Sequence, residues 1–352
     1  MALSTIPFSA LSSDASKQGV NFRNLIINGD MSIAQRGTSA SGVSNASGYH
    51  TCDRWLFAEE GFQTPVFTIS QTTDVPSGQG FGNSFKIDCT TADTSLGADN
   101  LGAIQQRIEG QNLQHLKFGT SSAESLTLSF WVKSTKTGTY QVNMRNQDNA
   151  SMFSQTYTIS SSNTWQKVTM TFTGDTGNAF NNDNGESIRL EWLLYVGTDY
   201  TSGTFASTWS NNLNNNARGV NHGVNFADST ANEWYITGVQ LEVGTSASDF
   251  EFLPYDVNLR RCQRYYYKYV LGFLGGYSRR AGTSISFSAL EAGTHPAPMR
   301  SSPTITAGTP TYINSSGLSF TSNTHALIAR VTSSSSAYYR AYETDVEVNA
   351  EL

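Results

Sequence analysis

The chain has 352 residues, of which 14% are charged and 12% are aromatic, and its formal net charge is −6. This length predicts two domains. The excess of acidic over basic residues excludes the strongly basic surface that is typical of nucleic-acid-binding proteins. The aromatic content, with glycine, serine, threonine and asparagine between apolar residues, favours β-sheets and turns over helical bundles.

The three cysteines, Cys52, Cys89 and Cys262, are far apart and form no Cys-x-x-Cys pair. This pattern predicts buried apolar side chains and indicates neither a disulfide framework nor a thiolate zinc site. The N-terminus lacks the charged start and continuous apolar core of a signal peptide, and no stretch approaches the length of a membrane span. We therefore expect a protein that is made in a reducing cytoplasm and does not insert into membranes; if it works outside a cell, it would leave by lysis.

Residues 1–22 contain too few apolar residues to bury a core of their own. Either this segment is a disordered tail, or it is an arm that becomes ordered on a partner surface. Its apolar contacts would come from Leu3, Ile6, Phe8 and Leu11.

Residues 23–250 predict short strands separated by turns. Leu25-Ile26-Ile27 runs into an Asn28-Gly29 turn signal, and the clearest alternation of apolar and polar residues lies at 126–133 and 140–145. Residues 101–118 predict a strand through Ile108 and then a short helix near Asn112. Further strands are expected at 55–57, 66–69, 84–89, 157–159, 165–172 and 188–196. Many short strands with turn residues between them predict an antiparallel sandwich.

The stretch 234–268 marks a junction between two bodies. Residues 235–243 alternate as a half-buried strand that ends at Gly244, and after Pro254 a short basic helix is expected, with Asp256 accepting hydrogen bonds from its first turn. We take 251–268 as a linker containing this helix and 269–352 as a small C-terminal β domain. Its strands are expected near 284–290, 304–313, 318–320, 326–331 and 338–348.

Three pieces of the sequence carry a resemblance. They are Arg-Asn-Leu-Ile-Ile-Asn-Gly-Asp-Met-Ser-Ile-Ala-Gln-Arg-Gly at 23–37, Asp-Arg-Trp at 53–55, and Gly-Val-Gln-Leu-Glu-Val-Gly at 238–244 with its continuation through 266. Together they resemble bacteriophage tail-fibre and other virion proteins, notably of marine phages. The resemblance implies location in the virion, an arm at 1–22 that docks onto other virion proteins, and assembly as a homotrimer.

A second resemblance concerns the order of the strands. The segments Leu-Ser-Phe-Trp-Val-Lys-Ser at 128–134, Gly-Thr-Tyr-Gln-Val at 138–142, Asn-Thr-Trp-Gln-Lys-Val-Thr at 163–169, and Tyr-Ile-x-Gly-Val-x-Leu at 235–241 are similar to carbohydrate-binding-module jelly rolls. In that group the opening and closing strands supply ligands for a structural calcium. Here Met31-Ser32 and Thr237-Gly238 stand at those places and only Asp30 remains, so we predict no metal site and no cofactor.

Nothing in the sequence predicts a catalytic residue. The five histidines have no metal-binding spacing, and neither a Gly-x-Ser-x-Gly elbow nor a phosphate-binding glycine loop is present. The acids Glu186, Glu191, Asp199 and Asp228 could flank a glycosidic bond only in the sense that any carboxylate could. We therefore expect a protein that is not an enzyme.

Exposed aromatic side chains are the candidates for stacking on sugar rings: Trp131, Tyr195, Tyr200 and Trp209. The last two lie at 200–232, a long asparagine-rich segment of the kind that is functional or poorly ordered. Trp165 and Trp192 lie in phase with core positions, and Trp55 resembles a buried anchor. The alternative is that the candidates mark protein interfaces, with Trp131 packed on a neighbouring domain.

A basic cluster follows the junction, comprising Arg260, Arg261, Arg264 and Lys268. Phosphate binding is one interpretation, but an acidic chain favours pairing with carboxylates across a subunit or domain interface.

The prediction is an all-β phage protein: an extended N-terminal arm, an antiparallel jelly-roll β-sandwich at 23–250 and a small C-terminal β domain. We expect a tail-fibre or head-fibre appendage that attaches by its arm and recognises a host surface polysaccharide without cleaving it. The alternative is a capsid or tail decoration protein that makes only protein contacts. A secreted glycan-binding module is disfavoured by the missing signal peptide.

Overall fold

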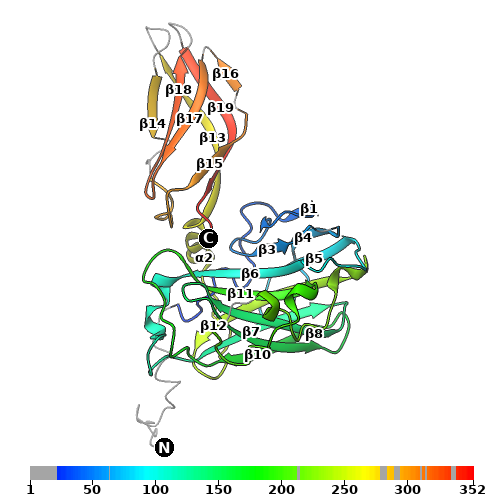
Figure 1. Ribbon diagram of the computed structural model, residues 1–352. Helices are drawn as coiled ribbons and strands as arrows, with labels where there is room; N and C mark the ends of the chain where they lie inside the picture. The colour runs from blue at the N-terminus through cyan, green and yellow to red at the C-terminus, as the bar shows by residue number, and fades with distance from the viewer. Residues whose placement is uncertain are drawn as a thin grey trace, which may run out of the picture. The chain divides into compact units, whose positions relative to one another are not determined.

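The computed structural model describes residues 22–62, 64–211, 215–277, 284–288, 294–309, 311–313, 315–333 and 338–352. The chain divides into two compact units, one ending at Leu253 and one starting at Pro254. Strands are the main regular elements of both units (Figure 1). The proposed arm residues Leu3, Ile6, Phe8 and Leu11 lie outside the described residues.

The first unit is an antiparallel sandwich of two six-stranded sheets. The first sheet has the order β1 (Ser39–Val43), β4 (Val66–Thr72), β5 (Ser84–Thr91), β12 (Glu233–Val243), β7 (Leu126–Ser134), β10 (Gln166–Phe172). The second sheet has the order β2 (Gly48–Tyr49), β3 (Leu56–Glu60), β6 (Leu101–Glu109), β11 (Glu186–Val196), β8 (Gly138–Asn146), β9 (Ser151–Ile159). From β5 to β12 the chain passes repeatedly from one sheet to the other. This is the jelly-roll arrangement, so the predicted fold class is confirmed.

Short 3₁₀ helices join several of these strands: η3 (Gly110–Asn112), η4 (Gln114–Leu116), η5 (Thr198–Tyr200), η6 (Asn215–Ala217) and η7 (Phe226–Asp228). The prediction of a strand through Ile108 followed by a short helix near Asn112 is confirmed by β6 and η3. No helix among the described residues has both the length and the apolar composition needed to cross a membrane.

The core of the first unit fills the space between its sheets. Leu128, Phe130 and Val132 on β7 point inward and are fully buried, as their alternation predicts. Trp192 is also buried, with its ring 5.5 Å from that of Trp55 and 5.8 Å from that of Phe130. Tilted and edge-to-face aromatic contacts of this kind stabilise the interior beyond area burial alone.

The N-terminal segment of the first unit is tied to β12, the last strand of that unit. The Leu25 amide donates to the carbonyl of Leu241 at 2.9 Å, and the Asn24 side chain both donates to the carbonyl of Val239 and accepts from the amide of Leu241. Gly29 packs so closely that a Cβ there would lie 2.1 Å from the Val239 carbonyl oxygen. Residues 23–29 and 238–244, which carry much of the virion-protein resemblance, therefore meet in space.

Asn28 links this segment to the third resembling piece. Its side-chain amide donates to the carbonyls of Ile33 and Asp53, while its oxygen accepts from the amide of Ile33. The indole nitrogen of Trp55 donates to the Asn28 carbonyl at 2.9 Å. Asn28 adopts φ of 59°, which asparagine tolerates better than most residues.

The second unit contains a four-stranded and a three-stranded antiparallel sheet. The strands are β13 (Tyr266–Tyr277), β14 (Ser284–Ser288), β15 (Thr304–Ala307), β16 (Thr311–Ile313), β17 (Ser315–Ser322), β18 (Leu327–Ser333) and β19 (Tyr338–Asn349). β13, β15 and β16 all pair with β19, whereas β14 and β17 flank β18. Their shared core includes Leu327, Val331 and Val346.

The helix expected after Pro254 is α2 (Tyr255–Gln263). Pro254 occupies the N-cap position and makes no side-chain cap, while Asp256 lies within the first turn. The predicted capping role of Asp256 is therefore corrected: its carboxylate is placed to interact with the positive end of the helix dipole. Cys262 is buried, as are Cys52 and Cys89, and none of the three forms a disulfide, which confirms their prediction as buried apolar side chains.

Candidate functional site

Two of the predicted sugar-stacking residues are buried inside the first unit. Tyr195 is fully buried, its ring is stacked 5.9 Å from Phe67, and its hydroxyl donates to Glu59. An irregularity in the pairing of β11 between Leu193 and Tyr195 breaks the alternation and turns this ring inward. The ring of Tyr200 is also buried. Neither ring is available to a sugar, so the sequence prediction is wrong for both.

The hydroxyl of Tyr200 donates to the Glu60 carboxylate at 3.2 Å and to the Asp99 carbonyl at 3.0 Å. Trp209 is partly buried and packs edge-on against Phe118 and Phe153. These residues hold their segment against the body of the sandwich. Trp209 has the same intermediate exposure as Trp131, so its role in stacking on a sugar stays a prediction.

Trp131 lies on the outer face of the first sheet and is partly exposed. On β7 it stands opposite Lys167 of β10 on one side and Thr237 of β12 on the other. Trp165 immediately precedes β10 and is also partly exposed, which corrects its predicted core position. The register makes the two tryptophans diagonal neighbours, about 7–8 Å apart.

Tyr235 is 5% exposed and supports the two tryptophans from within this group, which we call the aromatic platform: Trp131, Trp165 and Tyr235. The rings of Trp165 and Tyr235 meet at 6.1 Å, and the Lys133 ammonium lies 4.2 Å from the centre of the Tyr235 ring and 5.6 Å from that of Trp165. The indole nitrogen of Trp165 donates to Asp74 at 3.1 Å. Cation–π contacts and this hydrogen bond fix the orientation of the rings.

Charged side chains border the aromatic platform. Lys133 pairs with Asp74, and Lys86 pairs with Glu233 at 2.7 Å. Burial would raise the pKa of Asp74 and of Glu233, but the hydrogen bonds from Lys133 and Trp165 to Asp74, and from Lys86 and Tyr235 to Glu233, together with the lysine charges outweigh it and lower both pKa values. Both carboxylates therefore remain ionised at neutral pH and present strong hydrogen-bond acceptors beside the tryptophans.

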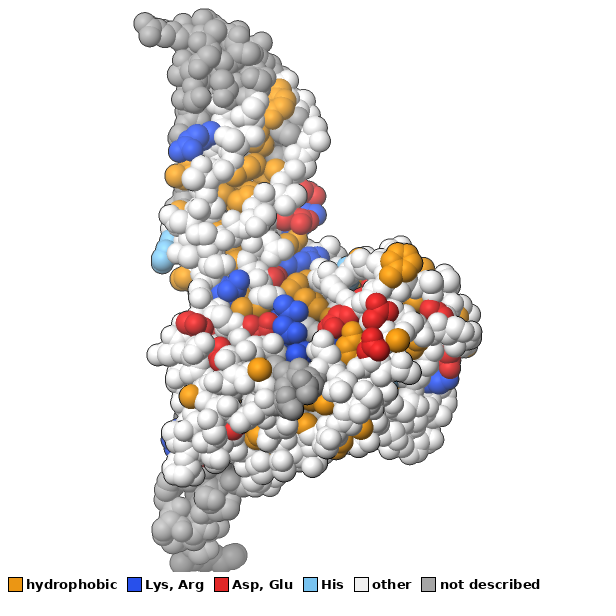
Figure 2. Space-filling model, viewed as in Figure 1, with side chains coloured by type: hydrophobic (Ala, Val, Ile, Leu, Met, Phe, Trp, Pro, Cys, Tyr) orange, Lys and Arg blue, Asp and Glu red, His pale blue; other side chains and the backbone are white. Residues whose placement is uncertain are grey.

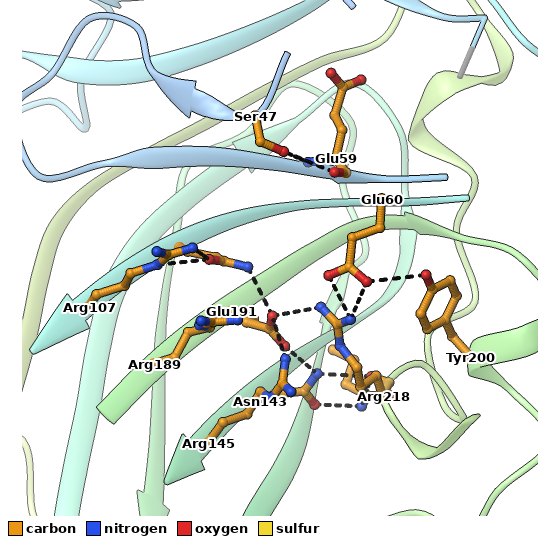
Figure 3. A network of polar contacts seen from close by, with 12 residues as sticks. Ser47, Glu59, Glu60, Arg107, Asn143, Arg145, Arg189, Glu191, Tyr200 and Arg218 are labelled. Carbon is orange, nitrogen blue, oxygen red and sulfur yellow. Dashed lines mark hydrogen bonds and ion pairs between the residues drawn. The ribbon is translucent and has the colours of Figure 1, made fainter. Parts of the chain in front are cut away.

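A second polar cluster lies on the outer face of the second sheet (Figure 3). At its centre Glu191 is fully buried and receives hydrogen bonds from Arg218 at 2.8 Å, Gln105 at 3.0 Å and Arg145 at 3.2 Å. Arg218 reaches across to bind both carboxylate oxygens of Glu60, at 2.7 and 2.8 Å. Arg218 thereby connects its own loop to β11 and to β3.

The electrostatics of this cluster do not suit acid catalysis. Burial would raise the pKa of Glu191, but the positive charges of Arg218, Arg145 and Arg189 outweigh it and lower that pKa to about 2. Of the other carboxylates considered from the sequence, Glu186 forms a two-point ion pair with Arg189. A general acid in glycoside hydrolysis needs a raised pKa, which is the opposite of what Glu191 has.

Asp228, another of those carboxylates, pairs with Lys136, and Asp199 lies in the exposed first turn of η5. Among the described residues, no group of three or more histidine, cysteine or acidic side chains is placed to hold a metal ion. Asp30, the one remaining residue of the calcium pattern, accepts a hydrogen bond from the Ser32 hydroxyl at 3.0 Å.

The basic cluster after the junction belongs to the second unit. Lys268 pairs with Asp345 at 3.0 Å and lies 3.9 Å from Glu347, both on the neighbouring strand β19. Arg264 donates to the carbonyl of Pro298 at 3.2 Å. The predicted carboxylate partner across an interface is therefore corrected for Lys268, whose partners lie in its own unit. Arg260 is exposed and Arg261 is partly buried.

No family model matches the chain, and no curated protein sequence matches it. Among solved structures, the chain is similar to the enzymatically active domain of tailspike protein 4 of bacteriophage CBA120, with 18% identity and a TM-score of 0.31. That match covers 58% of this chain and 21% of the tailspike chain, so the chain spans about a fifth of its length.

The chain is also similar to a carbohydrate-binding module in a structure titled "CBM4 structure and function", with 13% identity, a TM-score of 0.29, and coverage of 62% of this chain and 99% of the module. Another similar structure is the family 11 carbohydrate-binding module of cellulase Lic26A-Cel5E of Clostridium thermocellum. Its identity is 11% and its TM-score 0.29, with coverage of 59% and 97%.

Proposed function

We propose that the chain is a bacteriophage virion appendage protein, of a tail fibre or a head fibre, whose first unit recognises a host surface glycan without cleaving it. The observation that supports recognition is the aromatic platform on the outer face of the first sheet. Trp131 on β7 and Trp165, just before the adjacent strand β10, are partly exposed there and are bordered by ionised side chains.

The chemistry of the aromatic platform suits a sugar. An indole ring offers a flat apolar surface to the C–H face of a pyranose, while Asp74, Glu233 and Lys86 offer acceptors and donors to its hydroxyls. Contacts to these groups anchor the rings, so little side-chain freedom is lost on binding.

Recognition without cleavage is supported by the state of the carboxylates. Glu191 is held ionised in a buried arginine cluster, and Glu186 and Asp228 are paired with Arg189 and Lys136. A retaining or inverting glycosidase requires two carboxyl groups flanking the bond, one of them protonated at working pH.

The virion role is supported by the sequence pieces that resemble phage proteins. Residues 23–37, 53–55 and 238–244 come together where the N-terminal segment is bonded to β12. These residues act as one structural element, and the proposed docking arm precedes it in the chain. We further propose that the protein assembles as a homotrimer and that its N-terminal arm contacts other virion proteins.

The test is binding of the purified protein to intact host cells with and without periodate treatment of their surface. We expect binding that is lost after periodate and reduced at least tenfold by Trp131→Ala. The control is Phe62→Ala, which removes an 83% exposed aromatic in the turn after β3 and should bind like the parent. Binding that survives periodate would contradict glycan recognition, and binding that Trp131→Ala leaves unchanged would exclude the aromatic platform as its site.

A decoration protein making only protein contacts is the second candidate function. The observation that favours it is the apolar group of Phe81, Phe250 and Phe252, in which Phe252 is 51% exposed. Exposed apolar groups are typical of protein interfaces. Tight binding to assembled particles lacking this protein, together with no binding to cells, would favour decoration over glycan recognition.

A further inference from the structure

Three arginines stand in direct register across three adjacent strands of the second sheet. Arg107 on β6 is opposite Arg189 on β11, and Arg189 is in turn opposite Arg145 on β8. We call these residues the arginine row. Like charges placed directly opposite one another destabilise a sheet, so the row requires compensating anions.

At one end of the arginine row, Arg107 donates to the side-chain oxygen of Gln105 and shares Glu186 with Arg189. Glu186 forms two short hydrogen bonds with Arg189 and lies 3.7 Å from Arg107. At the other end, Arg145 has Glu191 as its ion-pair partner at 3.2 Å. Arg218 binds the same carboxylate oxygen at 2.8 Å and also pairs with Glu60, so Arg145 shares its acidic partner with a second guanidinium group.

Arg145 is the least satisfied member of the row. It is 93% buried, with 7% of its surface exposed, and its Nε makes no hydrogen bond. A guanidinium group carries five N–H donors, and a buried donor without an acceptor is costly. An acceptor supplied from outside the chain would satisfy it.

The arginine row can be reached from solvent. The side chains of Arg107 and Arg189 are each 18% exposed, whereas that of Arg145 is 9% exposed. Figure 2 shows a short file of basic side chains on this face of the first unit, over β6 and β11, with acidic side chains nearby. Adjacent strands are about 4.8 Å apart, so three strands extend over roughly 10 Å, the length of about two sugar rings.

We propose that the arginine row binds an acidic saccharide through a carboxylate or sulfate group. The planar guanidinium fork matches both anions in two-point hydrogen bonds. A site that is mostly buried admits a compact ligand of this kind and excludes a broad polyanion such as duplex nucleic acid. The site lies on the opposite sheet from the aromatic platform, and it stands independently of the function proposed for that surface.

The test is a nuclear magnetic resonance titration that follows the arginine Nε–Hε signals. The probe is a disaccharide containing glucuronic acid, compared with a neutral glucose disaccharide and with inorganic sulfate. We expect the Arg145 signal to shift with the acidic disaccharide and not with the neutral one. Arg107→Gln and Arg189→Gln should each weaken binding at least tenfold, whereas Arg330→Gln, the same substitution in the second unit, should leave it unchanged.

Two outcomes would overturn the proposal. One is the absence of a shift at Arg145, or unchanged affinity in the Arg107→Gln protein. The other is sulfate binding as tightly as the disaccharide, which would mean an adventitious ion only. If Arg189→Gln fails to fold, Arg189→Lys retains the charge opposite Glu186 but loses the fork, and it should show the same weakening. The Trp131→Ala protein should still bind the acidic disaccharide. Failure of this proposal can therefore be distinguished from failure of the function proposed for the aromatic platform.

Discussion

The side-chain amide of Asn24 donates a 3.0 Å hydrogen bond to the backbone carbonyl of Val239, 215 residues further along the chain. The oxygen of the same amide accepts from the backbone nitrogens of Ile26 and Leu241. One buried side chain thus joins the beginning of the sandwich to its last strand. Because this side chain satisfies three backbone groups, its loss should be felt throughout the unit.

Asn24→Ala should lower the free energy of unfolding by about 2–4 kcal/mol, because it leaves buried backbone groups without partners. Urea unfolding of the purified protein, followed by tryptophan fluorescence, measures the change. Asn221→Ala, at an exposed asparagine, should stay within about 0.5 kcal/mol of the parent. Equal effects of the two substitutions would contradict the linking role of Asn24.

Gly29→Ala should be strongly destabilising, by about 3 kcal/mol or more, because the added methyl would lie 2.1 Å from the Val239 carbonyl oxygen. Thermal unfolding provides the measurement. The matched control is Gly82→Ala, where an added Cβ meets no atom within 4 Å. A Gly29→Ala protein as stable as the Gly82→Ala protein would show that β12 does not approach Gly29 this closely.

The two carboxylates bound by Arg218 should differ in their contribution to stability. Glu191 is fully buried, so Glu191→Gln leaves buried guanidinium charge uncompensated and should cost about 3–5 kcal/mol. Glu60 has a side chain that is 37% exposed, and Glu60→Gln should cost about 1 kcal/mol or less because water replaces the lost charge. Urea unfolding of the two variants side by side tests this order.

His222 should make the stability of the first unit depend on pH. Burial lowers the pKa of this imidazole from 6.5 to about 4, although nearby backbone groups of Leu194 and Val224 oppose the shift. The unfolded chain therefore binds the proton more tightly than the folded chain does. The contribution of His222 is fully present above pH 6.5 and is lost as the pH falls towards 4, by about 3 kcal/mol in all.

Urea unfolding between pH 4 and pH 7 measures this dependence. In the folded protein the ring of Tyr140 lies 5.7 Å from the imidazole of His222. His222→Phe keeps an aromatic ring at this position, and it should flatten the dependence of the unfolding free energy on pH between pH 4 and pH 7. Glu191 also loses its contribution on acidification, but below pH 4.5, as the pH falls towards about 2. An equally steep dependence in the His222→Phe protein would assign it to another group.

Alternation of apolar and polar residues was sufficient to predict the fold class. It placed Phe130 and Val132 in the core and Trp131 on the outer face, because a strand directs successive side chains to opposite faces. It failed for Tyr195, where an irregularity in β11 reverses the direction of the ring. It also failed for Trp165, whose orientation depends on Asp74, 91 residues earlier.

The charged sites could not be predicted because they depend on register between strands. Arg107, Arg145 and Arg189 are scattered along the sequence, and only the pairing of β6, β11 and β8 places them in a row. Arg218 comes from an asparagine-rich loop, and nothing in the composition of that loop predicts that Arg218 binds acidic side chains. Its partner Glu191 alternates in a strand like any polar residue, and no local pattern marks it as buried.

The bonding of residues 24–29 to β12 has a consequence for biosynthesis. The first residues of the sandwich leave the ribosome early, but the backbone groups they need belong to residues 239 and 241. Contacts of such long sequence separation form slowly, since the intervening chain must first be confined. The first unit can therefore complete its fold only after nearly all of its strands have been synthesised, and nascent chains that stop before β12 would expose unpaired strand edges to one another.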